Sequence, residues 1–181
     1  MTKPTRTYTR LHDAGVELAS SIYQRTPLVA DTFLLDAVTW CCGKRGDLEI
    51  LEVGTCRGVS SAILAQRGRV LTIDKETRHG GDDALKALDV GARVVRITGP
   101  QELVRPLVRG KFDVCFIDAT HNYENGMRDF AFAVAHTNNV IFHDYCKDHP
   151  GIMATVDEVH KNHGGEFQLF DCFAALRKLN A

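Results

Sequence analysis

Two glycines, Gly54 and Gly58, follow the apolar stretch LEILEV at residues 48–53. A glycine loop directly after a buried strand is typical of a site for an anionic or nucleotide-like ligand. Further strand-like runs end in carboxylates, which are Asp74, Asp118 and Asp144. Carboxylates in these places can accept hydrogen bonds from sugar hydroxyls, bind a divalent metal ion or take part in proton transfer.

The loop lacks the features of two common phosphate sites. A nucleoside triphosphate site requires Gly-Lys-Ser/Thr after the loop, whereas Val59 follows Gly58. A dinucleotide site requires a second glycine where the backbone approaches the pyrophosphate, and Cys56 stands at that position. The loop therefore favours a ligand that carries a ribose and a small carboxylate but no phosphate.

Residues near the loop can bind such a ligand. Asp74, at the end of the second apolar run, can accept hydrogen bonds from both ribose hydroxyls. Ser60 and Ser61, at the start of the next helix, can bind a carboxylate or simply cap that helix. S-adenosylmethionine matches this description.

The elements that must position these residues are short apolar runs alternating with stretches of helical periodicity. Five runs, LEILEV, RVLTID, ARVVRI, FDVCFID and NVIFHD, are apolar enough to be buried on both faces of a parallel sheet. After a helix expected over about 152–163, the runs EFQLF and CFAALRKL are joined too tightly for a crossover helix, so we expect them to be antiparallel. The predicted fold is α/β: a doubly wound, mostly parallel seven-stranded sheet with an antiparallel last strand and helices on both faces.

Two further helices are expected. The stretch ADTFLLDAVTWCCGK lies in an N-terminal helical segment over 1–45, which carries no strand signal. Its apolar residues Phe33, Leu34, Leu35 and Trp40 belong either to the core or to a homodimer interface. After the fourth strand, apolar residues recur at helical spacing and predict a second helix that packs on the sheet. They are Tyr123, Met127, Phe130 and Val134.

Composition limits the class of protein. A chain of 181 residues predicts one domain over 1–181, with its sheet at 48–179. The net charge of −1 gives no field that would attract nucleic acid. No apolar run approaches the ~18 residues that span a membrane, and the start MTKPTRTYTR lacks the apolar centre of a secretion signal, so a cytoplasmic location is expected. The six cysteines contain no CxxC pair and predict reduced thiols.

Four motifs, in order, resemble those of the class I methyltransferase fold. They are EVGTCRGVSS at 52–61, ID at 73–74, FIDATHNY at 116–123 and FHDY at 142–145. Over residues 48–179 the sequence is most similar to the small O-methyltransferases related to catechol and macrolide-sugar methyltransferases. This resemblance implies a Rossmann-like sheet, S-adenosylmethionine as cofactor and O-methylation of a small hydroxylated acceptor molecule.

The resemblance also implies a set of cofactor contacts. Gly54, Thr55 and Gly58 would lie under the methionine part, with Glu52 beneath the loop and Ser60 and Ser61 after it. Asp74, followed by Lys75, would hold the ribose, and Asp118 would border the cofactor. Gln101 would hydrogen-bond adenine, with Glu102 as an alternative.

For the reaction, the resemblance implies that Asp118 and Asp144 bind a divalent metal ion, for which oxygen ligands suit Mg²⁺ or Mn²⁺. His121 is the expected general base and His143 the second choice, as base or ligand. Two departures leave metal dependence open. Tyr145 stands where catechol-type enzymes have an Asn ligand, and Ala119 stands where some sugar-modifying relatives have a further carboxylate.

Other interpretations remain at this point. The strand-end acids can serve as helix or turn caps, and His121 as a surface loop residue. A late group of mixed nitrogen and sulfur ligands could bind zinc, namely His143, Cys146, His149, His160 and His163, although His163 continues the apolar stripe of its helix. The alternatives to a methyltransferase are a noncatalytic S-adenosylmethionine-binding module and a hydroxylase-like or cofactor-cleaving enzyme on the same fold.

Overall fold

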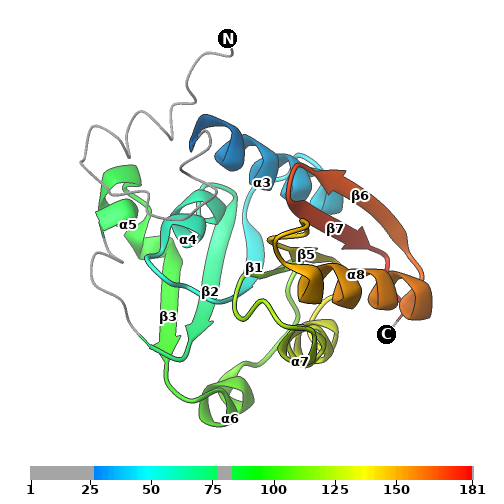
Figure 1. The fold of residues 1–181 in the computed structure, drawn as a ribbon. Coiled ribbons are helices and arrows are strands. Elements are labelled where there is room, and N and C mark those ends of the chain that lie inside the picture. Colours follow the sequence, from blue (N-terminus) through cyan, green and yellow to red (C-terminus); the bar gives the residue numbers. More distant parts are fainter. Residues whose placement is uncertain (1–26, 77–82, 181) are drawn as a thin grey trace.

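The structure, a computed structural model, describes residues 27–76 and 83–180. The expectation for most of the N-terminal segment, residues 1–26, lies outside the described residues. Seven strands form one sheet in the order β3-β2-β1-β4-β5-β7-β6 (Figure 1). Their bounds are β1 Leu48–Val53, β2 Gly68–Asp74, β3 Val94–Thr98, β4 Val114–Ile117, β5 Val140–Phe142, β6 Glu166–Phe170 and β7 Phe173–Arg177.

The direction of the strands confirms the predicted topology. Strands β1 to β5 pair in parallel, with Val53 opposite Ile73 on one side and opposite Ile117 on the other. Strand β7 pairs antiparallel with both β5 and β6. The chain order reverses at β1, where β2 lies on one side and β4 on the other. Such a switch point opens a crevice at the carboxyl ends of the strands.

Helices cover both faces of the sheet (Figure 1). Helices α3 (Pro27–Cys42), α4 (Val59–Leu64) and α5 (Asp83–Leu88) pack on one face, and α6 (Gln101–Val104), α7 (Tyr123–Val134) and α8 (Pro150–His163) pack on the other. Successive residues of a strand point to opposite faces, so Ile50 belongs to the first apolar core and Leu51 to the second. Two short 3₁₀ turns, Gly91–Arg93 and Arg105–Leu107, complete the described elements.

Helices α7 and α8 approach each other closely because glycines remove side chains at their contacts. A Cβ on Gly126 of α7 would lie 2.6 Å from Thr155 Oγ1 of α8, and a Cβ on Gly151 would lie 2.8 Å from the carbonyl oxygen of His121. The first turn of α8 therefore rests directly on the loop that precedes α7. That loop ends at Asn122, whose side-chain oxygen accepts a hydrogen bond from the Asn125 backbone N–H and caps α7.

Several expectations about single side chains need correction. Tyr123 was expected to pack on the sheet, but it is exposed and its hydroxyl donates to Glu158 on α8. The apolar residues of α3 belong to the core: Leu34 is buried, and Trp40 packs against Phe170 of β6. They therefore give no support to a dimer, and a homodimer stays a prediction.

All six cysteines are free thiols, as their spacing predicted. Within the described residues, no helix combines the length and the apolar character needed to cross a membrane.

Candidate active site

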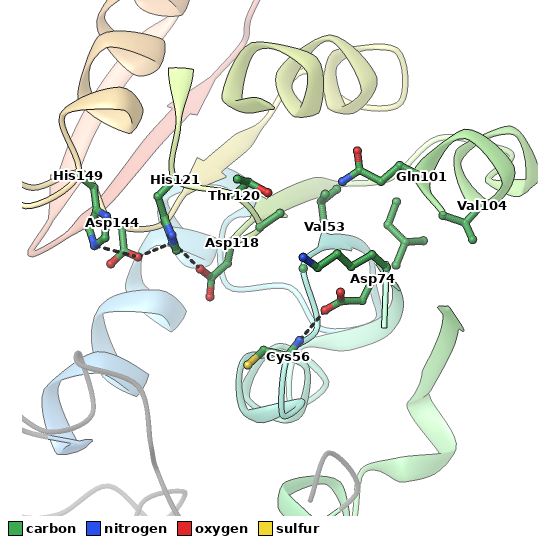
Figure 2. Close-up of a pocket in the computed structure, with 14 residues that line it drawn as sticks. Val53, Cys56, Asp74, Gln101, Val104, Asp118, Thr120, His121, Asp144 and His149 are labelled. Atoms are coloured by element: carbon green, nitrogen blue, oxygen red, sulfur yellow. Dashed lines mark hydrogen bonds and ion pairs between the residues drawn. The ribbon is translucent and has the colours of Figure 1, made fainter. Parts of the chain in front are cut away.

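Backbone hydrogen bonds continue past the strand ends and bring the chemically important residues to one edge of the sheet. Gly54 N–H donates to Ile73, Asp118 N–H to Val53 and His143 N–H to Ile117, each to a carbonyl oxygen at 2.8–3.0 Å. The acids that end the apolar runs are thus neighbours across the sheet. They border a cavity of about 380 Å³ (Figure 2), a volume within the range of small-molecule sites.

The cavity has two halves. One is lined by the end of β1, the glycine loop, the end of β2 and helix α6, namely Val53, Gly54, Cys56, Ile73, Asp74, Lys75, Gln101 and Val104. The other is lined by the segments that follow β4 and β5, namely Asp118, Ala119, Thr120, His121, Asp144 and His149. Figure 2 shows Asp74 and Cys56 on one side and the His121, Asp144 and His149 group on the other.

The backbone geometry of the loop requires glycine at position 54. Gly54 has a φ of 99°, and a Cβ there would lie 2.1 Å from the carbonyl oxygen of Asp118. The β1 and β4 ends can therefore meet only if residue 54 lacks a side chain. Asp74 fixes the two loop residues that follow Gly54, because its Oδ2 accepts hydrogen bonds from the backbone N–H groups of Thr55 and Cys56 at 2.8 Å each.

Glu52 is fully buried beneath this loop and organises the start of α4. Ser60 Oγ donates to one of its carboxylate oxygens at 2.6 Å, and Ser61 Oγ donates to the other. Burial raises the pKa of Glu52 to about 7, although the hydrogen bonds from Ser60, Ser61 and Thr72 act in the opposite direction.

This arrangement differs from the expected role of the two serines. Ser60 and Ser61 are buried, neither lines the cavity, and their hydroxyls bind Glu52 rather than cap α4 or face a ligand. The physical reason is that a buried carboxylate must accept hydrogen bonds. The hydroxyls of Ser60 and Ser61, in the first turn of α4, donate them.

Some of the remaining predicted cofactor residues line the cavity and others do not. Lys75 and Gln101 line the cavity, whereas Glu102 is exposed and does not. Thr55 turns its hydroxyl inward to Thr72 at 2.6 Å. Gly58 adopts a φ of 73° at the start of α4 and serves the turn.

Three histidines and two aspartates converge at the other half of the cavity, and all of them except His143 line it. His121 Nε2 lies 2.8 Å from Asp144 Oδ2 and 3.8 Å from Asp118 Oδ1. His143 Nδ1 lies 2.8 Å from Asp118 Oδ1 and 3.5 Å from Asp144 Oδ2, and His149 Nε2 lies 3.7 Å from Asp144 Oδ2. The aspartates therefore do not act as helix or turn caps alone, since each carries imidazole partners.

The charges in this cluster stabilise one another. Burial alone would raise the pKa of Asp118, but the charge of His143 and hydrogen bonds from His121 and His143 outweigh burial and lower it to about 2. Hydrogen bonds to Asp118 and Asp144 raise the pKa of His121 to about 9, against the effect of burial. For His143, burial lowers the pKa, but the charge of Asp118 dominates and raises it well above its ordinary value.

The neighbouring carboxylates therefore favour the protonated form of both predicted bases. His121, with 38% of its side chain exposed, lines the cavity and can reach an acceptor. His143 is buried, is not part of the cavity lining, and packs against Phe173 with ring centroids 5.0 Å apart. The geometry thus favours His121 over His143 for contact with a substrate, while His143 positions Asp118.

The late zinc group, which the sequence left open as an alternative, does not assemble. His160 stacks on Phe167, and His163 packs edge-on against Phe130, as its place in the apolar stripe predicted. Among the described residues, the groups with metal-ligand spacing are His121, Asp144 and His149 in one case, and Asp118, His143 and Asp144 in the other. Of the five residues of this alternative group, His143 and His149 take part, each with aspartates that the sequence analysis assigned to the Mg²⁺ or Mn²⁺ site.

Of the cavity-lining residues that the sequence analysis did not assign to the site, two have a metal-binding or nucleophilic side chain, His149 and Cys56. His149 was grouped with the wrong partners, because it precedes α8 and joins His121 only where that helix meets the loop after β4. Cys56 was read only as a missing glycine, yet it lines the cavity and is exposed. Its position between the two loop glycines is the signal that could have identified it.

Comparison with known proteins identifies the family. A family described as a methyltransferase domain matches residues 51–145, which run from within β1 to the end of the FHDY motif. The chain belongs to this methyltransferase family. The matched range includes every cavity-lining residue except His149.

Individual relatives agree with this membership. The chain is 31% identical over 116 residues to a catechol O-methyltransferase of Mycobacterium tuberculosis. The aligned region covers 60% of this chain and 53% of that protein. The chain thus spans about half the length of this relative.

Solved structures share the fold. The S-adenosylmethionine complex of TomG from Streptomyces achromogenes, an O-methyltransferase of tomaymycin synthesis, has a TM-score of 0.64 at 21% identity and covers 98% of this chain and 92% of its own. PaMTH1 from Podospora anserina, solved with S-adenosylhomocysteine, has a TM-score of 0.68 at 15% identity, with 97% and 88% covered.

Proposed function

We propose that this protein is an S-adenosylmethionine-dependent methyltransferase that methylates a hydroxyl of a small molecule. The observation that carries the proposal is that one cavity joins two different sets of residues. Asp74 and Gln101 at one end suit a nucleoside, and Asp118, His121 and Asp144 at the other end suit a hydroxyl that must lose its proton. A binding module would need the first set alone.

The nucleoside half supports S-adenosylmethionine over a phosphate ligand. Asp74 uses Oδ2 for the loop, while its Oδ1 accepts a long 3.3 Å hydrogen bond from Glu76 N–H. Oδ1 is thus available for a ribose hydroxyl, and a carboxylate here would repel a phosphate. The ligands of TomG and PaMTH1, on the same fold, are consistent with this assignment.

The acceptor half would prepare the nucleophile. When bound, S-adenosylmethionine supplies a methyl group on a sulfonium, which an oxygen can attack in line while the carbon–sulfur bond breaks. His121 would contact the acceptor hydroxyl and take its proton once a bound cation or the acceptor loosens its ion pairs with Asp118 and Asp144. These two aspartates would hold such a cation, and the resemblance described above implies Mg²⁺ or Mn²⁺.

The proposal is tested in two steps with purified protein. Calorimetric titration should detect binding of S-adenosylmethionine, with no comparable binding of NAD or ATP. Labelled methyl groups should then pass to members of a panel of catechols, phenols and sugars, with and without added divalent ions. Binding without transfer to any member would favour the noncatalytic module, and release of cleaved cofactor without methylated product would favour a cofactor-cleaving enzyme. Either result would overturn the proposal.

A further inference from the structure

One carboxylate oxygen in the acceptor half lies at the centre of three imidazoles. Asp144 Oδ2 has His121 Nε2 at 2.8 Å, His143 Nδ1 at 3.5 Å and His149 Nε2 at 3.7 Å. Two of these rings, His121 and His149, line the cavity and face each other with centroids 4.5 Å apart. The cluster is therefore rich in nitrogen donors at the side from which a ligand would enter.

The spacing of His121, Asp144 and His149 fits a metal ion. Donor atoms bound about 2.1 Å from one ion are about 3 to 3.5 Å apart in octahedral or tetrahedral geometry. The donor atoms of these three residues all lie within 4.8 Å of one another, and Asp144 Oδ2 is 2.8 Å from His121 Nε2 and 3.7 Å from His149 Nε2. Small side-chain shifts would bring all three to one ion, with its other positions open to the cavity.

An oxygen-only centre has less support in this chain. The family's third oxygen ligand would stand at position 145, where the Tyr145 hydroxyl instead donates to Asp157 of α8 at 2.8 Å. Asp118 and Asp144 would then be the two remaining oxygen side chains, and Mg²⁺ would have to complete its octahedron with water or substrate oxygens, while the imidazoles beside Asp144 would stay unused. Imidazole ligands select first-row transition metals instead.

Packing fixes His149 in this place. It lies immediately before Pro150, and Gly151 allows the first turn of α8 to touch the backbone of His121 and Asn122. The His149 backbone N–H donates to the Cys146 carbonyl oxygen at 2.9 Å, which closes the turn after Asp144. Backbone contacts thus place the two imidazoles side by side, and the contact of His121 with Asp144 orients the His121 ring toward the same carboxylate oxygen that His149 approaches.

We propose that His121, Asp144 and His149 form a binding site for a first-row transition-metal dication such as Zn²⁺, in preference to Mg²⁺. In this arrangement His143 is a positioning residue that holds Asp118 beside the ion. As a ligand, His121 would no longer take the proton itself; the ion would bind the acceptor hydroxyl and lower its pKa, so that the proton is released to solvent. That role of the ion rests on the proposed function, whereas binding of the ion does not.

The test measures metal binding directly. Protein stripped with a chelator is titrated with Zn²⁺ and Mg²⁺ by calorimetry, and with Co²⁺ by visible absorption, which reports nitrogen and oxygen coordination. We expect one Zn²⁺ per chain, bound on the order of 100-fold more tightly than Mg²⁺. Equal affinity for the two ions, or no Zn²⁺ binding, would overturn the proposal and leave the cluster as a set of ion pairs.

Variants assign the site to these residues. H149Q should weaken Zn²⁺ binding roughly 10- to 100-fold or more, since loss of a ligand should cost at least what loss of a supporting residue does. H160Q is the matched control, because His160 is exposed on α8 outside the cavity, and it should leave the affinity unchanged. H121Q provides a second ligand variant if H149Q unfolds in a thermal melt. Unchanged affinity in a folded ligand variant would contradict the assignment.

Titration of S-adenosylmethionine into the same preparations separates this inference from the proposed function. If S-adenosylmethionine binds and its methyl group is transferred but Zn²⁺ does not bind, the metal site alone is wrong. If Zn²⁺ binds as expected and S-adenosylmethionine does not, the methyltransferase proposal alone is wrong.

Discussion

The imidazole of His121 forms an ion pair with Asp144, with 2.8 Å between Nε2 and Oδ2. Together with Asp118, this contact raises the pKa of His121 to about 9 from an ordinary 6.5. An imidazolium between two carboxylates occupies the position that a cation would otherwise take, so the cluster is electrically balanced without a ligand.

The first prediction concerns the pH dependence of stability. A histidine with a raised pKa in the folded protein stabilises it fully below its unfolded pKa of 6.5, and this contribution is lost as the pH rises through about 9. The free energy of unfolding of the wild type should therefore exceed that of H121Q most at about pH 6 and least at about pH 9.5, as measured by urea denaturation of metal-free protein.

The control for this experiment is H160Q, which alters an exposed histidine that stacks on Phe167. Its difference from the wild type should change less between the two pH values. If H121Q and H160Q followed the same course, the ion pairs of His121 would not control this dependence.

The second prediction concerns Asp74 and the cofactor. D74A removes the acceptor for two loop N–H groups and for the expected ribose hydroxyl. Hydrogen bonds to charged groups contribute about 1.5–3 kcal/mol, so the dissociation constant for S-adenosylmethionine should rise roughly 10- to 150-fold in calorimetry. D36A, at an exposed position of α3, should bind like the wild type. An unchanged affinity in D74A would remove the ribose assignment.

A third prediction compares two glycines. Gly43 and Gly54 both have positive φ, 72° and 99°, but a Cβ on Gly43 meets nothing within 4 Å. G43A should therefore lower the free energy of unfolding by only about 1–2 kcal/mol, the cost of a left-handed backbone in a residue with a side chain. G54A should lose more in the same denaturation assay, because its Cβ would overlap the Asp118 carbonyl oxygen. Equal losses would mean that the loop can move away from β4.

The fourth prediction concerns Glu52. Burial raises its pKa to about 7 from 4.5, so its contribution to stability is fully present below about pH 4.5 and is lost as the pH rises through 7. E52Q, which carries no charge, should become more stable relative to the wild type between about pH 5 and pH 8. E102Q, at an exposed position, is the control and should keep a constant difference. A constant difference in E52Q as well would show that Glu52 keeps one charge state over this range.

Much of the fold could be predicted from local patterns. The seven apolar runs became the seven strands, and the acids predicted at strand ends lie at one edge because parallel strands share a direction. Some runs were read too long: β5 ends at Phe142, and Asp144 follows in a left-handed conformation with a φ of 59°. Hydrophobic periodicity has no information on where a ladder stops and the backbone turns.

The site was predictable where a residue follows directly from a strand end, and not where side chains from distant segments meet. The sequence by itself determined the glycine loop, Asp74, Asp118 and Asp144, since strand order and direction fix those positions. The tertiary structure alone decided that Ser60 and Ser61 turn inward to Glu52, and that His149 joins His121. Both outcomes depend on how elements pack together. The buried carboxylate of Glu52 needs hydrogen-bond donors, and the absence of a side chain at Gly151 lets α8 approach the loop that carries His121.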